Sequence, residues 1–134
     1  MLINLSNHPL NSWSRKQKNV AKQQFGPIID LPFPPVPTDA GIDDIINLTY
    51  KYVDECLRLV HENRLENSMG TKIQNAIHVM GEMTFVYQFV QKMSELGVLC
   101  VASTSKRIAQ VNDDGSKTAV FEFVRFRPFT IELY

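Results

Sequence analysis

Three short polar clusters hold the side chains that could bind a ligand or take part in catalysis. Each cluster directly follows an apolar run, which burial alone does not require. The clusters are Ser6, Asn7 and His8; Gly81, Glu82, Met83 and Thr84; and Ser103, Thr104 and Ser105, followed by Lys106 and Arg107. In open α/β sheets, ligands bind outside the carboxyl ends of the strands. We therefore expect the three clusters to form one ligand site.

His8 and Glu82 are the candidates for catalysis. Imidazole titrates near neutral pH, so His8 could donate to a phosphate or move a proton. Glu82 could act as a general base, or accept a hydrogen bond from a ribose hydroxyl or a base amine. Each also has a structural alternative: His8 could bond only the backbone at a strand end, and Glu82 could cap a helix. His78, inside an apolar run, is predicted to be a satisfied core residue, and His61 to be solvated.

Gly81 and the helix start behind it are predicted to bind an anion. Glycine lets a ligand approach the backbone, and the first N–H groups of a helix carry positive potential. The signal is a single glycine, with neither GxGxxG nor a P-loop. Lys106 and Arg107 could neutralise phosphate charge, with Arg125 and Arg127 added, or could simply be solvated hairpin charges.

The elements that must position these clusters alternate between strand and helix. Strands are predicted at residues 2–5, 28–31, 76–80 and 98–102, the last continuing toward 111 and returning at 117–126 after a turn at 112–116. Helices are predicted from Ser12 or Ser14 to Phe25, from Thr38 or Asp39 to Val60, and from 81–84 to Leu96, with residues 61–69 as a loop. Strand 98–102 is the most apolar and is predicted to be central.

This order predicts an α/β fold, a single Rossmann-like three-layer domain over residues 1–134. Its sheet is mainly parallel and ends in an antiparallel C-terminal hairpin strand. Residues 32–37 contain four prolines, so they form either a connection over the sheet edge or a rigid wall of the ligand site.

Composition excludes several classes of protein. The chain has 134 residues, with 14 basic and 14 acidic side chains, so it lacks the basic excess of a broad nucleic-acid surface. Cys56 and Cys100 have no metal-site spacing, so we expect two buried thiols, no metal and no cofactor. The sequence shows neither a membrane-spanning run nor a signal peptide, and unlinked thiols suit a reducing compartment, so we expect a cytoplasmic location without membrane partners.

Three segments resemble small stand-alone CRISPR-associated Rossmann-like proteins, which are single-domain relatives of the CARF sensor domains and include ring nucleases. The segments are residues 2–9, the helix start at 81–85 and the strand at 101–107. The resemblance implies an antiviral-defence protein, a homodimer that binds a cyclic oligoadenylate across its two-fold axis. Some such proteins cleave the ring and others only bind it.

In the resemblance, cleavage needs no metal, because the ribose 2′-hydroxyl attacks the adjacent phosphate. His8 or Glu82 would assist the proton transfer, and Lys106 or Arg107 would neutralise phosphate charge. The chain departs from a well-equipped nuclease, since neither a paired histidine nor a dense basic motif is visible. Three alternatives stay open: a non-catalytic sensor or sponge, an unrelated small-nucleotide hydrolase or transferase that uses Glu82, and a structural subunit.

Overall fold

The computed structural model describes residues 1–64 and 74–131 and shows a five-stranded sheet with three helices. In chain order the elements are β1 (Leu2–Ser6), a 3-10 turn (Leu10–Ser12), α1 (Arg15–Phe25), β2 (Ile28–Asp30), α2 (Ile42–Arg64), β3 (Ala76–Met80), α3 (Met83–Glu95), β4 (Leu99–Val111) and β5 (Lys117–Pro128). The sheet order is β2-β1-β3-β4-β5. All pairs are parallel except β4 with β5, so the predicted fold class is confirmed.

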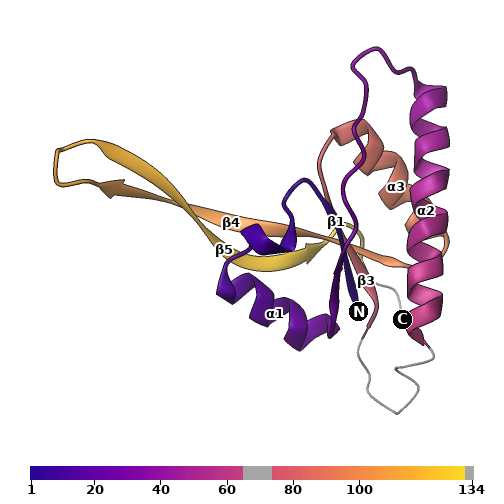
Figure 1. Cartoon of the computed structure of the whole chain (residues 1–134), viewed down its shortest axis with the longest axis horizontal. Helices are drawn as coiled ribbons and strands as arrows, with labels where there is room; N and C mark the ends of the chain where they lie inside the picture. The colour runs from indigo at the N-terminus through magenta and orange to yellow at the C-terminus, as the bar shows by residue number, and fades with distance from the viewer. Residues whose placement is uncertain (65–73, 132–134) are drawn as a thin grey trace.

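The helices cover both faces of the sheet. α1 lies on one side, and α2 and α3 lie together on the other (Figure 1). This division follows from the strand order: the chain first steps outward from β1 to β2 and then steps the opposite way, and right-handed crossovers place the two sets of helices on opposite faces.

Alternate side chains of the strands enter different cores. Ile3 packs in the cluster under α2 and α3, whereas Leu2 packs with Trp13 on the α1 side. By the two-residue period of a strand, Asn4 belongs to the α1 side as well. His78 lies there too, because its ring meets that of Trp13 edge-on at 5.2 Å. Two polar residues are therefore buried on the α1 face of the sheet.

The strand at 98–102 is an interior strand between β3 and β5, although β3 and not β4 occupies the middle of the sheet. It is covered on both faces, as predicted, because Cys100 is buried in the core under α2 and α3 and Val101 in the core on the α1 side. β4 pairs with β3 only from Leu99 to Val101, and beyond Ser103 its side chains are increasingly exposed. The apolar run is therefore only the part of a longer strand that lies within the body of the sheet.

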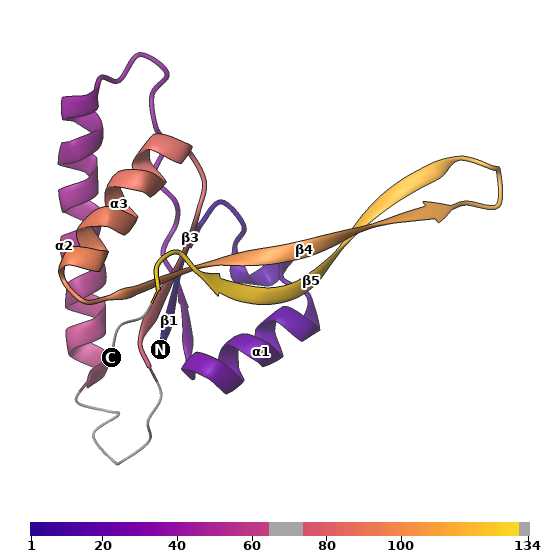
Figure 2. The ribbon, with the colours of Figure 1, turned by 180° about the vertical axis from the view of Figure 1, so that it is seen from behind.

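β4 and β5 continue past the body as a long two-stranded arm, which Figure 2 shows projecting away from the helices. A bulge interrupts their register: Thr104 pairs with Arg125, but Ser105 pairs with Phe123. The extra residue in β5 brings Phe123 and Phe126 to the same face, although they are three residues apart. Both are buried on the α1 side.

The limits of α2 differ from the prediction at both ends. The helix begins at Ile42 rather than after Thr38 or Asp39, and the backbone N–H of Gly41 donates to Asp44 Oδ2 at 3.0 Å. It continues through Arg64, so the loop predicted at 61–69 was wrong for residues 61–64, and residues 65–69 lie outside the described part. The last turns are polar and are stabilised by ion pairs, such as that between Arg58 Nη1 and Glu62 Oε1 at 2.6 Å.

The start of α1 and the ends of α1 and α3 are as predicted. Ser14 caps α1, accepting a hydrogen bond from the backbone N–H of Gln17 at 3.2 Å. Gly26 follows α1 with a φ of 84°, and Gly97 follows α3 with a φ of 73°, a backbone conformation that favours glycine.

Candidate functional site

The carboxyl ends of β1 and β3 meet at the point where the strand order reverses, which is the usual ligand position in this topology. Asn7 N donates to the carbonyl of Met80 at 3.3 Å, so the cluster after β1 lies beside the cluster after β3. Ser103 Oγ lies 3.1 Å from Met80 Sδ. The fold therefore brings the three clusters to one edge of the sheet, as expected.

A cleft of about 430 Å³ opens at this edge on the α1 side. It is lined by His8, Ser12, Trp13, Gln17, His78, Met80, Ser103, Ser105 and Phe121. The wall thus combines imidazoles, hydroxyls and an amide with aromatic rings. A small ligand with polar and flat apolar parts suits such a lining.

His8 is held by its backbone while its side chain is exposed. Its N–H donates to Ser6 Oγ at 3.2 Å, and its carbonyl accepts from Asn4 Nδ2 at 2.9 Å and from Trp13 Nε1 at 3.0 Å. Among residues 1–64 and 74–131, its imidazole has no hydrogen-bond partner. The loop is therefore rigid, and the ring remains available to a ligand.

His78 is 1% exposed, which confirms it as a core residue. Its Nδ1 lies 2.8 Å from Asn4 Oδ1 and its Nε2 lies 3.1 Å from Ser103 Oγ. Burial, with a smaller contribution from His8, lowers the pKa of His78 to about 4. His8 and His78 nevertheless line the same cleft, so the fold supplies a pair of histidines that the sequence did not reveal.

The carboxylate of Glu82 is used to cap α3. It accepts hydrogen bonds from Thr84 N at 3.0 Å, Phe85 N at 2.8 Å and Thr84 Oγ1 at 2.6 Å. These hydrogen bonds, first that of the Thr84 hydroxyl, hold the pKa of Glu82 below its usual range. The structural alternative for Glu82 is therefore the one observed, and its carboxylate occupies the N–H groups that were predicted to bind an anion.

Gly81 is accounted for by packing. A Cβ atom at this position would lie 2.4 Å from Cζ of Phe33, whose ring also meets Phe85 edge-on at 5.2 Å. The glycine thus lets the proline-rich segment pack on the start of α3. Met83 is 82% exposed, and none of the residues at 81–84 lines the cleft.

The basic candidates do not line the cleft, but one of them borders it. Lys106 and Arg107 are exposed on the arm, and Arg107 is the direct cross-strand partner of Phe121, which lines the cleft. Arg125 and Arg127 are also exposed, opposite Thr104 and Ala102. None of these four basic residues lines the cleft.

The start of α1 also contributes positive potential at the cleft. Ser12, just before the helix, and Gln17, in its first turn, line the cleft. That turn carries Arg15 and Lys16 and no acidic residue, but Lys16 Nζ lies 4.0 Å from Glu122 Oε1 on β5. Arg15 and the N–H groups that Ser14 does not cap therefore favour a negatively charged ligand nearby.

A second hollow, of about 440 Å³, lies on the other side of the residue 7–9 loop. It is lined by Asn4, Ser6, Asn7, Pro9, Asp30 and residues 31–34. The proline-rich segment is thus both the connection from β2 to α2 and one wall of a hollow at the strand ends, so its two interpretations are compatible.

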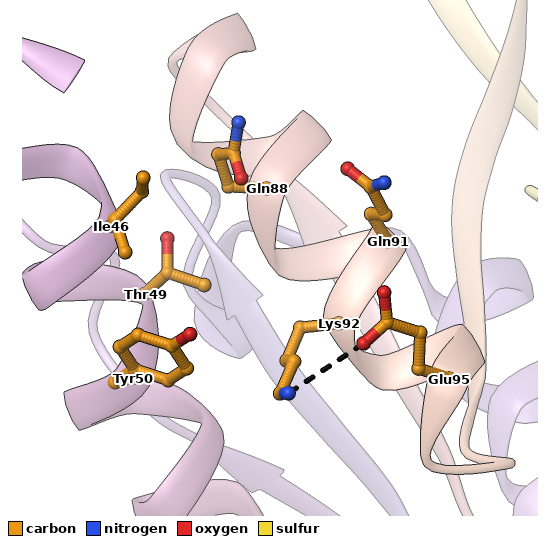
Figure 3. Close-up of a pocket in the computed structure, with 7 residues that line it drawn as sticks. All are labelled: Ile46, Thr49, Tyr50, Gln88, Gln91, Lys92 and Glu95. Atoms are coloured by element: carbon orange, nitrogen blue, oxygen red, sulfur yellow. Dashed lines mark ion pairs between the residues drawn. The ribbon is translucent and has the colours of Figure 1, made fainter. Parts of the chain in front are cut away.

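A third hollow, of about 190 Å³, lies between α2 and α3 and is lined by residues of these two helices (Figure 3). Lys92 crosses it: its Nζ lies 3.5 Å from Glu95 Oε2 and 5.6 Å from the ring centre of Tyr50. The only cation of this groove is therefore already paired within the described residues, and the groove is an ordinary seam between helices.

The remaining expectations concern metals, thiols and membranes. Residues 1–64 and 74–131 contain no group of three potential metal ligands. Cys56 and Cys100 are both buried, as predicted, and desolvation raises the pKa of each to about 12. In the described part of the chain, no helix combines the length and apolarity needed to cross a membrane.

The geometry can be set beside known proteins. One family model, described as "Uncharacterized protein MJ1673 family", matches residues 1–127. The chain belongs to this family. Searches of curated proteins and of solved structures found no match. The matched range includes the whole cleft and nearly all of β5, so the site lies within the part that defines the family.

In this MJ1673-family chain, sequence reasoning located His8, Ser103 and Ser105 at the site. It missed the residues that α1 and β5 contribute: Ser12, Trp13, Gln17 and Phe121. The basic start of α1 was a readable signal, because acids are the usual residues in a first helical turn. Phe121 shares a face of β5 with Phe123, which packs on the α1 side, but the sequence alone did not show that this face borders the cleft.

Proposed function

We propose that the protein binds a small anionic nucleotide of the cyclic oligoadenylate class in the cleft beside His8. The observation that supports this most is the position of the cleft. It lies at the switch point of a doubly wound sheet, and an unpaired imidazole and a positively polarised helix start face it.

The lining offers a place for each part of a nucleotide. Phe121 is 69% exposed at the edge of the cleft, and its ring could stack on a base. Gln17 and Ser12 could bond the edge of that base. His8 could donate to a phosphate, as could the N–H groups at the start of α1.

The proposal includes a homodimer, because a cyclic ligand with two-fold symmetry presents equal halves to two identical surfaces. It also places the protein in the cytoplasm. Ring cleavage would use the ribose 2′-hydroxyl and no metal, with His8 moving the proton. The pairing of Glu82 within α3 disfavours the alternative in which Glu82 is a nucleophile or base. A non-catalytic sensor or sponge remains the second candidate, since Lys106 and Arg107 lie outside the cleft.

The test is to measure binding and product together. Cyclic tetra-adenylate and cyclic hexa-adenylate are titrated by calorimetry, with a linear tetra-adenylate as the control, and chromatography follows any product. His8→Ala should weaken binding or abolish cleavage, whereas His61→Ala, an exposed histidine on α2, should change neither. Light scattering measures the dimer. If neither ring binds at concentrations up to the millimolar range, the proposed ligand is wrong.

A further inference from the structure

Four side chains from four adjacent strands form a line of hydrogen bonds across the α1 face of the sheet. Asp30 Oδ1 on β2 accepts from Asn4 Nδ2 on β1 at 2.9 Å. Asn4 Oδ1 lies 2.8 Å from His78 Nδ1 on β3, and His78 Nε2 lies 3.1 Å from Ser103 Oγ on β4. The sheet register sets this line, because Asn4 is the direct partner of both Asp30 and His78.

The surroundings of Asn4 determine which way its amide points. Its Nδ2 faces two acceptors, the carboxylate of Asp30 and the carbonyl of His8, each at 2.9 Å. Its Oδ1 therefore faces His78. Because an amide oxygen can only accept, Nδ1 of His78 must carry the ring proton. Leu10 N donates to both carboxylate oxygens of Asp30 at 3.1 Å, so the far end of the line is fixed as well.

The tautomer of His78 determines the direction of its hydrogen bond with Ser103. With the proton on Nδ1, Nε2 of His78 has a free lone pair and accepts a hydrogen bond from the Ser103 hydroxyl, in preference to Met80 Sδ at 3.1 Å, which is a weak acceptor. The low pKa of His78, about 4, keeps the ring neutral and able to accept at neutral pH. His78 is 1% exposed, whereas Ser103 is half-buried and lines the cleft, so the imidazole reaches the cleft through the serine oxygen.

The arrangement matches that of an activated serine: a hydroxyl, a histidine base and a group that orients the histidine. An asparagine serves as the orienting group only if its oxygen, rather than its NH₂ group, faces Nδ1, because the opposite orientation imposes the wrong tautomer. The two acceptors at Nδ2 of Asn4 enforce the productive orientation here.

We propose that Ser103 is a nucleophile activated by His78, with Asn4 and Asp30 as positioning residues, and that it attacks a phosphorus(V) ester bound in the cleft. In the step, the bond from Ser103 Oγ to phosphorus forms and the bond from phosphorus to the leaving oxygen breaks. The serine proton passes to His78 Nε2 and then to the leaving oxygen. Water afterwards hydrolyses the phosphoserine ester, so no oxidant or metal is required.

This inference depends on the proposed function for the position of the ligand, and it makes Ser103 the nucleophile in place of the ribose 2′-hydroxyl. Its test uses no nucleotide. The probe is an alkyl fluorophosphonate, which an activated serine attacks with loss of fluoride. Ser105 is an internal comparison, because it lies two residues further along the same face and lines the same cleft, but has no hydrogen bond to His78 within the described chain. The control variant is Ser94→Ala, at an exposed position on α3. Intact mass and peptide mapping measure the adduct.

We expect one adduct per chain on Ser103, none on Ser105, none with Ser103→Ala, and an unchanged rate with Ser94→Ala. Asn4→Ala should slow labelling at least tenfold in protein that still unfolds cooperatively, and His78→Gln should slow it further. Lack of labelling of the folded wild type, or a Ser103→Ala variant that is labelled equally fast, would overturn the proposal. Cyclic adenylate binding by Ser103→Ala is measured separately, so loss of reactivity is distinguished from loss of the ligand site.

Discussion

Asn4 Oδ1 lies 2.8 Å from His78 Nδ1, on the next strand of the sheet, and both residues are only 1% exposed. Water cannot replace a partner at this depth. His78 Nδ1 therefore depends on Asn4 Oδ1, which also accepts from Ser6 Oγ at 2.7 Å, and a buried donor left without an acceptor costs about 1–3 kcal/mol. The pair also links β1 to β3 at the strand ends that form the cleft.

Replacing Asn4 tests how much its buried hydrogen bonds contribute to stability. Asn4→Leu keeps the branched shape but removes both polar atoms, so His78 Nδ1 loses its acceptor and the hydrogen bonds with Asp30, His8 and Ser6 are lost too. We expect the free energy of unfolding to fall by about 2 kcal/mol or more. Urea unfolding followed by circular dichroism measures it. Asn7→Leu, at an exposed position in the adjoining loop, is the control and should change the value by about 0.5 kcal/mol or less. Equal losses in both variants would contradict the role of the buried pair.

Burial of His78 predicts how stability depends on pH. Its pKa is lowered to about 4 in the folded chain, from 6.5. Between these values the unfolded chain binds a proton that the folded chain does not. Stability is therefore fully present above pH 6.5 and falls as the pH is lowered toward 4, by roughly 3 kcal/mol in all.

Urea unfolding at a series of pH values, compared with two variants, assigns this effect. His78→Gln should flatten the profile between pH 6.5 and 4. His8→Ala should leave most of it, since His8 is the titratable neighbour in the cleft and contributes the smaller part of the lowered pKa. Asp30 reaches His78 only through the Asn4 amide. A wild-type profile as flat as that of His78→Gln would disprove the burial effect.

The strand and helix order was predictable because apolar periodicity is a local property. The position of β4 was not, because Leu99 to Val101 look the same in a central strand and in a strand that leaves the sheet. His8 and Ser103 were identified by type and position. Their connection through His78 was not, because it depends on which strands are neighbours, and residues 78 and 103 lie 25 positions apart.

The sequence identified Gly81 as a position where a neighbouring group comes close to the backbone, but not whether that group is a ligand or a side chain. Gly81→Ala should lower the free energy of unfolding by roughly 1–3 kcal/mol, because its Cβ would overlap the ring of Phe33. In a Phe33→Leu background, the same change should cost at least 1 kcal/mol less, as measured by a double-mutant cycle. An identical cost in both backgrounds would show that Phe33 is not the reason for the glycine.

Replacing Glu82 distinguishes a capping role from a catalytic role. Glu82→Ala removes the acceptor of two N–H groups at the start of α3, so the thermal midpoint should fall. Binding of cyclic adenylates and labelling of Ser103 should be unchanged below that midpoint, because Glu82 does not line the cleft. Calorimetry and mass spectrometry on the same preparation measure both. A Glu82→Ala variant with normal stability but no ligand binding would show that Glu82 takes part in ligand binding.

Phe121 gives the most direct test of how a base would bind. Its ring is 69% exposed at the mouth of the cleft, so Phe121→Ala removes little buried surface and should leave the unfolding midpoint unchanged. Loss of one base–aromatic stack should cost about 1–3 kcal/mol of binding, or roughly 5- to 150-fold in Kd. Phe121→Tyr should restore the affinity, because it keeps a stacking ring. Val111→Ala, 72% exposed near the tip of the same arm, should have no effect. If Phe121→Ala and Val111→Ala bind a cyclic adenylate equally well, the base does not stack on β5, and the ligand must be sought on the Asn7 side of the loop.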